Sequence, residues 1–488
     1  MVAEKNRIIL LFVISLIITV FRSNALANSE DIKTLKQQCL TDLDFIQNQL
    51  EENSASYANK DDKDFHYWYN KGYEDALELI ESIGDKDDCY YIMKYYVNGF
   101  GQSHVSIRGY YPLPAEMYPG FVVTRKVDGH FRVVYKNPSL TYLKGISIGD
   151  KVTHIDNLTI EEYYEDYVKP FYANDESELT TISASVFAFI IDGNRFKPIP
   201  RKVTVIHDGN KVLLDLKYTE LKGQALDAVK KLRQPDVNKS FSVEMLSNGV
   251  WIKIPTFFPS KKEVVYYTGM LSTLKNGLAK EDFIIFDMRG NRGGSSKWAI
   301  PLIRNLWGDL YLKSLKSAHD YNRDWIKKIR ISKKNLVEFR QQYDASSVKS
   351  YITSMKKGES YYTKKWSIYD DTENLYTNTD NKPFRAKIYV LTDNFCRSTC
   401  WNFVKELKQI PGVTHLGQQT AVQSIYSHAY KDLSPSKYFD LFYPAQMRVQ
   451  PDYKLEESLI PDHIFGGDPR NEVEIIDWVL SIVEQETS

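Results

Sequence analysis

Two strand–loop–helix units in the second half of the chain constrain its fold more than any other feature. The first begins with the apolar run Phe283–Phe286, continues through a glycine-rich loop and enters a helix predicted near Ser296–Leu306. The second begins with Lys387–Thr392 and leads through a turn into a helix predicted at residues 398–409. Short apolar runs of this kind are typical of strands buried on both faces of a sheet. We therefore predict an α/β core whose site lies at the carboxyl ends of these strands.

The N-terminus predicts a leader for export. Lys5 and Arg7 precede the apolar run Ile8–Phe21, and the small residues Ala25 and Ala27 follow it. This order is typical of a secretory signal peptide, and the run is shorter than the ~20 residues that span a bilayer. We expect cleavage near Ala27, no stable membrane insertion afterwards, and a periplasmic or secreted mature protein.

The remaining sequence changes character along its length, which predicts three domains. Residues 28–115 show the periodicity of amphipathic helices. Residues 116–225 have the pattern of short strands and glycine turns, and Gly149–Asn157 resembles the turn and strand of a PDZ domain. Residues 226–488 hold the α/β core, with a Tyr- and Lys-rich insertion at 308–384 that is a candidate lid or oligomer contact. A chain of 488 residues is long enough for several such cores.

Composition and charge argue against some classes of protein. Hydrophobic residues make up 43% and charged residues 26% of the chain, as in folded globular proteins. The formal net charge is zero, so no global field attracts the chain to nucleic acid or to an anionic membrane. We interpret the Lys- and Arg-rich segment 313–365 as a solvated basic face. No cofactor is predicted, and the oligomeric state stays open.

Four cysteines are compatible with two disulfides in an oxidising compartment. Cys39 and Cys89 are candidates to join two helices of the N-terminal region. Cys396 and Cys400 lie around Ser398, where a local bridge is within reach of disulfide geometry. A metal site would need more Cys or His nearby, so none is predicted.

A glycine-rich loop follows the first buried strand and carries the sequence Asp287-Met288-Arg289-Gly290-Asn291-Arg292-Gly293-Gly294. Glycines allow a turn in which backbone N–H groups point at one spot, and the helix behind the loop adds its positive end. Such a loop suits a phosphate or an oxyanion. It lacks the ending of a nucleotide P-loop and the spacing of a dinucleotide fingerprint, so we interpret it as an oxyanion site.

Ser398 begins the helix after the second buried strand and is the candidate nucleophile. At a helix N-terminus a hydroxyl lies in the positive end of the dipole, and the N–H of Thr399 can face a developing oxyanion. Serines at this position are mostly helix caps. The glycine loop at the end of another strand is what favours catalysis here.

A nucleophilic serine needs a base, and the chain has nine histidines. His104 stands out because the glycine-flexed segment Gly99–Val105 places it directly after Ser103. His415 and His428 are alternatives nearer to the site in sequence. We interpret the others as surface or structural residues: His66, His130, His154, His207, His319 and His463.

Taken together, these motifs resemble the C-terminal processing peptidases and the tricorn protease core. The most specific motif is the Asp-x-Arg-x-Asn-x-Gly-Gly loop, matched in full at residues 287–294. The strand–turn–Ser–helix segment is similar to the family's nucleophile segment and places the nucleophile on Ser398. Gly417–Thr420 looks like the family's Gly-x-x-Thr strand end, and Pro461-Asp462 looks like its late turn.

The resemblance covers most of Gly99–Val479. It implies a ClpP/crotonase-like α/β protease core with an N-terminal helical domain and a PDZ-like β-rich domain. The processing-protease branch pairs its serine with a lysine, and the equivalent position here is Gln423.

The tricorn branch is more similar to this chain. Its Ser-His pair is matched by Ser103 and His104, and it uses an acid before the late turn. We align that acid with Glu456 and keep Glu457 in reserve, with Leu455 as the alternative left by a one-residue ambiguity.

These matches imply a role for each residue. His104 takes the proton of Ser398 and returns it to the leaving group, while Ser103 and Glu456 orient or polarise the histidine. The oxyanion donors are the N–H groups of Gly293 or Gly294 together with Thr399. The polar residues of the loop hold its shape: Asp287, Arg289 and Asn291.

The resemblance therefore implies an exported serine peptidase that hydrolyses polypeptides through an acyl-enzyme. A PDZ-like module would bind a chain end or an extended segment by strand addition. Two alternatives stay open: a catalytically inactive binding protein on the same fold, and a serine esterase.

Overall fold

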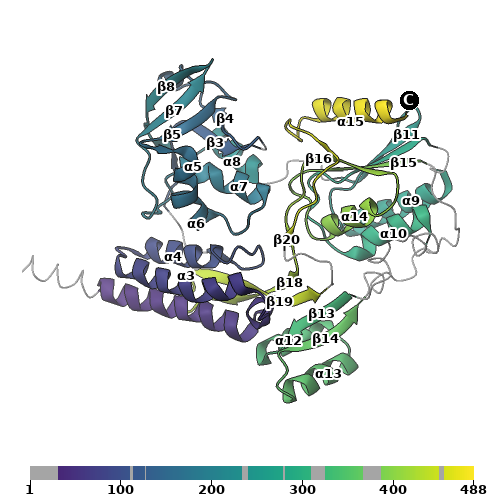
Figure 1. Cartoon of the computed structure of the whole chain (residues 1–488), viewed down its shortest axis with the longest axis horizontal. Coiled ribbons are helices and arrows are strands. Elements are labelled where there is room, and N and C mark those ends of the chain that lie inside the picture. Colours follow the sequence, from purple (N-terminus) through teal and green to yellow (C-terminus); the bar gives the residue numbers. More distant parts are fainter. Residues whose placement is uncertain are drawn as a thin grey trace, which may run out of the picture.

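The computed structural model describes residues 31–109, 114–126, 128–233, 240–277, 281–308, 325–366, 386–449 and 456–487. The predicted signal peptide, residues 1–27, lies outside them. Figure 1 shows a helical layer and a β-rich domain on one side of the molecule and an α/β core on the other. Two strands, β18 (Tyr426–Leu433) and β19 (Phe439–Val449), run beneath the helical layer.

The helical layer is formed by residues 31–53 and three further helices: α2 (Ala55–Ala58), α3 (Lys63–Glu81) and α4 (Lys86–Asn98). The short α2 lies within the polar stretch that separates the two helical halves of this region in sequence. Asp62 and Asp85 cap α3 and α4 by accepting backbone N–H groups that have no partner inside the helix. A disulfide between Cys39 and Cys89 joins the first helix to α4.

The helices pack on a five-stranded antiparallel sheet in the order β1-β19-β13-β14, with β18 also paired to β19. Its remaining strands are β1 (Ser106–Gly109), β13 (Trp325–Arg330) and β14 (Tyr361–Trp366). Leu441, Tyr443 and Ala445 of β19 are buried in the core that the helices cover.

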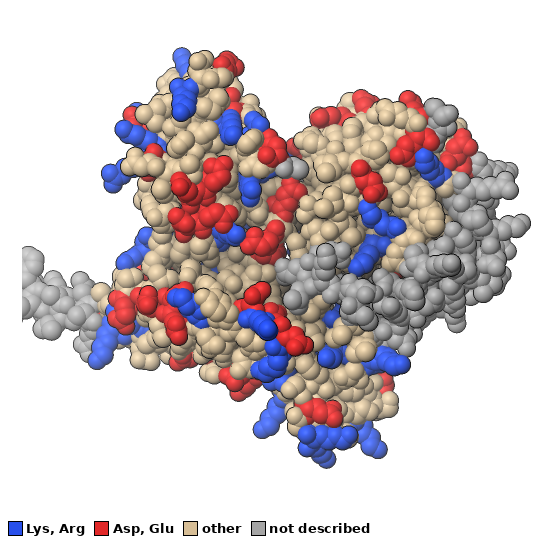
Figure 2. Space-filling view, viewed as in Figure 1, with Lys and Arg blue, Asp and Glu red and all other residues tan. Residues whose placement is uncertain are grey.

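Part of the predicted insertion is an ordered unit. Residues 325–366 supply β13 and β14 and the helices α12 (Lys333–Gln342) and α13 (Ala345–Lys356). Figure 2 shows Lys and Arg side chains along the outer edge of this unit. Its exposed basic residues include Lys333, Arg340, Lys349, Lys356 and Lys357. This arrangement is that of a solvated basic face.

The β-rich domain is built on a sheet in the order β3-β4-β5-β7-β8, with β6 beside β5. Its strands are β3 (Phe121–Arg125), β4 (Phe131–Lys136), β5 (Lys151–Ile155), β6 (Leu158–Thr159), β7 (Lys202–His207) and β8 (Asn210–Asp215). A separate ladder joins β2 (Met117–Tyr118) to β9 (Thr219–Glu220). The helices of the domain are α5 (Ile160–Tyr163), α6 (Lys169–Tyr172), α7 (Glu178–Ser185) and α8 (Gln224–Arg233). The edge strand β3 lies next to α7 and α8.

The α/β core contains a six-stranded sheet in the order β10-β11-β12-β15-β16-β21, parallel except for the β10–β11 pair. Its strands are β10 (Ser242–Met245), β11 (Gly249–Lys253), β12 (Phe283–Asp287), β15 (Lys387–Thr392), β16 (Val413–Gly417) and β21 (His463–Ile464). One face is covered by α9 (Lys261–Gly277), α10 (Ser296–Trp307) and α14 (Thr399–Lys408), and the other by α15 (Glu472–Thr487). Within the described parts of the chain, no helix combines the length and the apolar character that a membrane crossing requires.

Successive residues of the central strands face opposite layers. Ile284 and Phe286 of β12 pack in the core under α10 and α14, whereas Ile285 packs under α15. Both faces are buried, which confirms the interpretation of these apolar runs. The parallel register sets Asp287 at the end of β12 beside Leu391 of β15, so the loops that follow the two strands meet at one edge of the sheet.

The Cys39–Cys89 bridge should stabilise the helical layer because it closes a long loop and so restricts the unfolded chain. The two residues are 50 apart in sequence, and removing such a cross-link is expected to lower the free energy of unfolding by about 4 kcal/mol. We predict that Cys39→Ser/Cys89→Ser accelerates amide hydrogen exchange in α4. Cys396→Ser/Cys400→Ser, which opens a bridge between residues only 4 apart, should leave α4 exchange unchanged. Equal exchange in both variants would contradict the prediction.

Candidate active site

The glycine loop is anchored by a buried ion pair. Arg289, 1% exposed, donates from Nε and Nη2 to the two oxygens of Asp287 at 2.9 and 2.6 Å and reaches Glu472 of α15 at 3.1 Å. Trp251 of β11 donates its indole N–H to the same Asp287 carboxylate. The guanidinium and carboxylate groups are therefore paired inside the fold, and they fix where the loop leaves β12.

Asn291 shapes the next turn of the loop. Its Nδ2 donates to the Ile254 carbonyl, and its Oδ1 accepts the N–H of Gly293, each at 2.8 Å. The Gly293 N–H is thus already bonded. The N–H of Gly294 has no acceptor among the described residues and is the loop donor left for a ligand.

Ser398 has a backbone conformation that only a constrained site maintains. Its φ is 57° and its ψ is −122°, outside the regions that residues with a Cβ ordinarily adopt. Such a conformation costs roughly 1–3 kcal/mol and clusters at functional sites. Ser398 is exposed, and its Oγ has no hydrogen-bond partner in the described part of the chain. The strained turn therefore presents a free hydroxyl to solvent.

The glycine loop and the Ser398 turn lie in direct contact. A Cβ on Gly293 would lie 2.7 Å from the Arg397 carbonyl oxygen and 2.8 Å from the Ser398 Cβ, so only glycine fits there. Thr399 Oγ1 donates to the Gly294 carbonyl at 2.6 Å. These contacts bring all the predicted nucleophile and oxyanion residues together.

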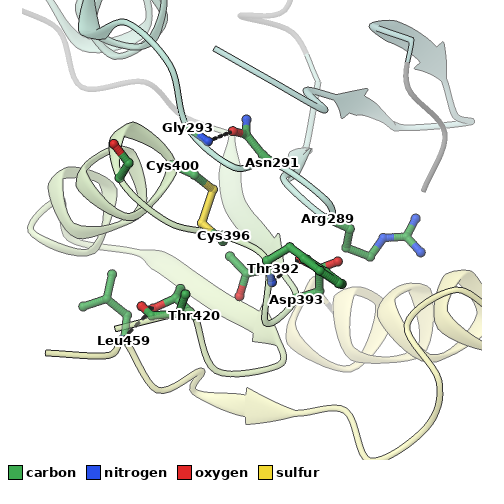
Figure 3. Close-up of a disulfide and its surroundings, with 12 residues drawn as sticks. Arg289, Asn291, Gly293, Thr392, Asp393, Cys396, Cys400, Thr420 and Leu459 are labelled. Atoms are coloured by element: carbon green, nitrogen blue, oxygen red, sulfur yellow. Dashed lines mark hydrogen bonds between the residues drawn. A yellow bond between two sulfur atoms is a disulfide. The ribbon is translucent and has the colours of Figure 1, made fainter. Parts of the chain in front are cut away.

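Two further features tie the turn down. The Cys396–Cys400 disulfide closes it on the core side, and Figure 3 shows this bridge facing the Asn291–Gly293 segment of the loop. Asp393 accepts the N–H groups of Gly290 and Phe395 at 2.9 and 3.1 Å and so links the two loops. Burial raises the pKa of Asp393 to about 6.

His104 reaches this edge of the core from the helical layer. Ser103 Oγ lies 3.3 Å from His104 Nδ1, which leaves Nε2 as the nitrogen available to a substrate or a nucleophile. The loop is pinned by the buried Gln102, whose amide bonds Ser56 Oγ and Asp62 at 2.7 and 3.1 Å. Between His104 and Ser398, both described, no hydrogen bond is formed; in free enzymes such bonds often form only with substrate.

Burial and nearby cations set the protonation of His104. Burial, followed by the positive charges of Arg448 and Arg397, lowers the pKa of His104 to about 4 against an opposing effect of Asp175. Arg397 directly precedes Ser398, and its charge lowers the pKa of His104. The nucleophile turn therefore lies within electrostatic range of the imidazole. The imidazole is neutral at pH 7, which is the form a general base requires.

The predicted acid lies in a short ladder next to the site. Glu456 and Glu457 form β20, which pairs antiparallel with β17 (Gln423–Ser424) so that Glu456 is opposite Ser424. Thr420 holds the chain that follows by accepting the Leu459 N–H at 2.9 Å, as Figure 3 shows. Leu455 lies outside the described residues.

The other candidate histidines have structural surroundings. His415 is fully buried, its Nε2 lies 2.8 Å from Thr392 Oγ1, and burial lowers its pKa to about 3. His428 lies on β18, beside the ring of Tyr430. Among the described residues, no three His, Cys, Asp or Glu side chains gather as metal ligands would.

A cavity of about 450 Å³ lies between the β-rich domain and the core. Thr124 and Arg125 of β3, Leu179 and Ile182 of α7, and the segment 393–395 contribute to its lining. The same segment leads into the Ser398 turn. The cavity is therefore bounded by β3 and α7 on one side and by the segment that precedes the Ser398 turn on the other.

Comparison with known proteins bears on the core. Residues 250–458, which contain the glycine loop, Ser398 and Gln423, match the model of Peptidase family S41. A structure of mature CPAF complexed with lactacystin superimposes with a TM-score of 0.61 at 12% identity, covering 93% of this chain and 99% of that one. Mature CPAF alone gives a TM-score of 0.59 at 13% identity, covering 93% and 98%. At these identities the likeness is one of fold.

A search of curated proteins found no match. The family match spans the nucleophile turn and its glycine loop, and the fold of the chain resembles that of mature CPAF over 93% of its length. Residues 250–458 of this chain therefore carry the sequence pattern of peptidase family S41.

Proposed function

We propose that this protein is an exported serine peptidase that hydrolyses polypeptides through an acyl-enzyme on Ser398. The observation that carries the proposal is the conformation of Ser398. Its left-handed backbone is held against the glycine loop, and its hydroxyl is exposed and unbonded among the described residues. A turn of this kind stores strain where a nucleophile must project from the chain.

The residues around Ser398 support a complete acyl transfer. His104 Nε2 accepts the hydroxyl proton as Ser398 Oγ attacks the carbonyl carbon. The N–H groups of Gly294 and Thr399 receive the oxyanion; Gly293 takes no part, because its N–H is bonded to Asn291. Collapse of the intermediate breaks the peptide bond, and the proton passes from His104 to the leaving amine. Water then cleaves the ester by the same route.

Ser103 and Glu456 are proposed to orient and polarise His104. The contact between Ser103 Oγ and His104 Nδ1 supports the first role, and the β17–β20 ladder beside Gln423 supports the second. Losing one oxyanion donor would cost about 3 kcal/mol of transition-state stabilisation.

The substrate is proposed to be an extended polypeptide bound in part by a PDZ-like domain. The cavity between β3 and α7 is suited to an extended segment, and residues 393–395, which help to line it, precede Ser398. The signal-peptide pattern at residues 1–27 supports action in the periplasm or the medium.

Fluorophosphonate labelling tests the proposed nucleophile, because the reagent needs an activated hydroxyl and an oxyanion hole. We predict that the mature protein is labelled, that Ser398→Ala abolishes labelling, and that His104→Ala lowers its rate at least 100-fold, within the range of general-base effects. Ser139→Ala and His130→Ala serve as matched controls and should label at the native rate. Lactacystin, bound in the similar CPAF structure, should compete with labelling.

An unlabelled native protein with an intact fold would instead indicate an inactive binding protein. If labelling is present, hydrolysis of an alkyl ester with no cleavage of unfolded polypeptides would identify an esterase.

The low pKa of His104 predicts an unusual pH profile. Because the base must be neutral, the labelling rate should rise with pH through a midpoint near 4 and be constant above pH 6. An unperturbed histidine would give a midpoint near pH 6.5. Arg397→Met removes a cation that lowers this pKa, so its midpoint should move upward. The rates are measured over pH 3.5–8 with circular dichroism at each pH. A midpoint near pH 6.5 in the native protein would contradict a general base whose pKa is lowered by burial.

A further inference from the structure

The side-chain amide of Gln423 accepts a hydrogen bond from Ser398 that has no role in the catalytic steps proposed above. Gln423 is 5% exposed, and its Oε1 accepts the backbone N–H of Ser398 at 3.0 Å. Its Nε2 donates to the Ser424 carbonyl at 3.1 Å, which fixes the orientation of the amide. The oxygen and the nitrogen of the Gln423 amide are thus both hydrogen-bonded, and these two bonds fix the orientation of the side chain.

This bond acts on the residue whose conformation most needs support. The N–H of Ser398 precedes the first turn of α14 and has no partner within the helix. The Ser398 carbonyl accepts the Asn402 N–H at 3.0 Å. With both backbone groups bonded, the turn cannot relax to an ordinary conformation without leaving the buried Gln423 oxygen unpaired.

We propose that Gln423 is a positioning residue that holds the Ser398 backbone in the conformation that exposes Oγ. The inference rests on the proposed function. A neutral amide bonds the Ser398 N–H without adding a charge to the nucleophile turn. Because it takes the Ser398 N–H, it also leaves the oxyanion to the N–H groups of Gly294 and Thr399.

Gln423 also connects the nucleophile to the strand pair that carries the proposed acid. It lies in β17, opposite Glu457 of β20, and the neighbouring Ser424 is opposite Glu456. A displacement of β17 would therefore change the Ser398 turn and the position of β20 together. This coupling makes Gln423 the structural link between two ends of the proposed proton relay.

The test compares two replacements of similar size. Gln423→Met removes the acceptor, and we expect kcat for a fluorogenic polypeptide to fall about 10- to 100-fold with KM within about twofold, because a buried bond to the reacting residue is lost. Gln446→Met, at a glutamine that is also 5% exposed, is the matched control and should keep native kcat.

The outcomes separate this inference from the proposed function. If Ser398→Ala abolishes activity but Gln423→Met keeps native kcat, the positioning role is wrong while the nucleophile stands. The role is also wrong if the loss in Gln423→Met is matched by a loss of thermal stability, or if the loss appears in KM instead of kcat. Activity that survives Ser398→Ala would overturn the proposed function itself.

Discussion

The site depends on how closely the glycine loop approaches the turn that carries Ser398. A side chain at Gly293 would overlap the Arg397 carbonyl, so the two strand-end loops meet with backbone against backbone. The approach requires the parallel β12–β15 pairing and the buried Arg289–Asp287 ion pair that directs the loop. Once the loops meet, the N–H groups of Gly294 and Thr399 lie at one edge of the sheet. The proposed nucleophile and oxyanion donors are placed by that contact.

The histidine reaches the site by a different route. The segment before β1 carries His104, and β1 is paired with β19, which also carries Arg448. The helical layer and the sheet beneath it therefore hold the proposed base against the core. Burial at this junction keeps the imidazole neutral, while the adjacent arginines favour the same state. The N-terminal layer is in this view part of the active site and not an accessory.

Individual strands, helices and loops were predictable from the sequence, whereas contacts between residues far apart in the chain were not. The central strands, the helix after Ser398 and the glycine loop were found because burial and glycine spacing are local properties. The Gly293 N–H was among the predicted oxyanion donors, but Asn291, two residues earlier, takes it. The bond from Ser398 to Gln423 depends on the path of the chain between β16 and β18, which no local pattern encodes. The pairing of β13 with β19 was missed for the same reason.

The most direct test of the account is to identify where the acyl group resides during turnover. An activated peptide ester is mixed with the mature protein, quenched in acid within the first turnover, and the protein is mapped by mass spectrometry. The account predicts one acylated peptide, containing Ser398, that forms before free acid and disappears as acid appears. Product release with no acyl group on Ser398, or with the group on another residue, would contradict it.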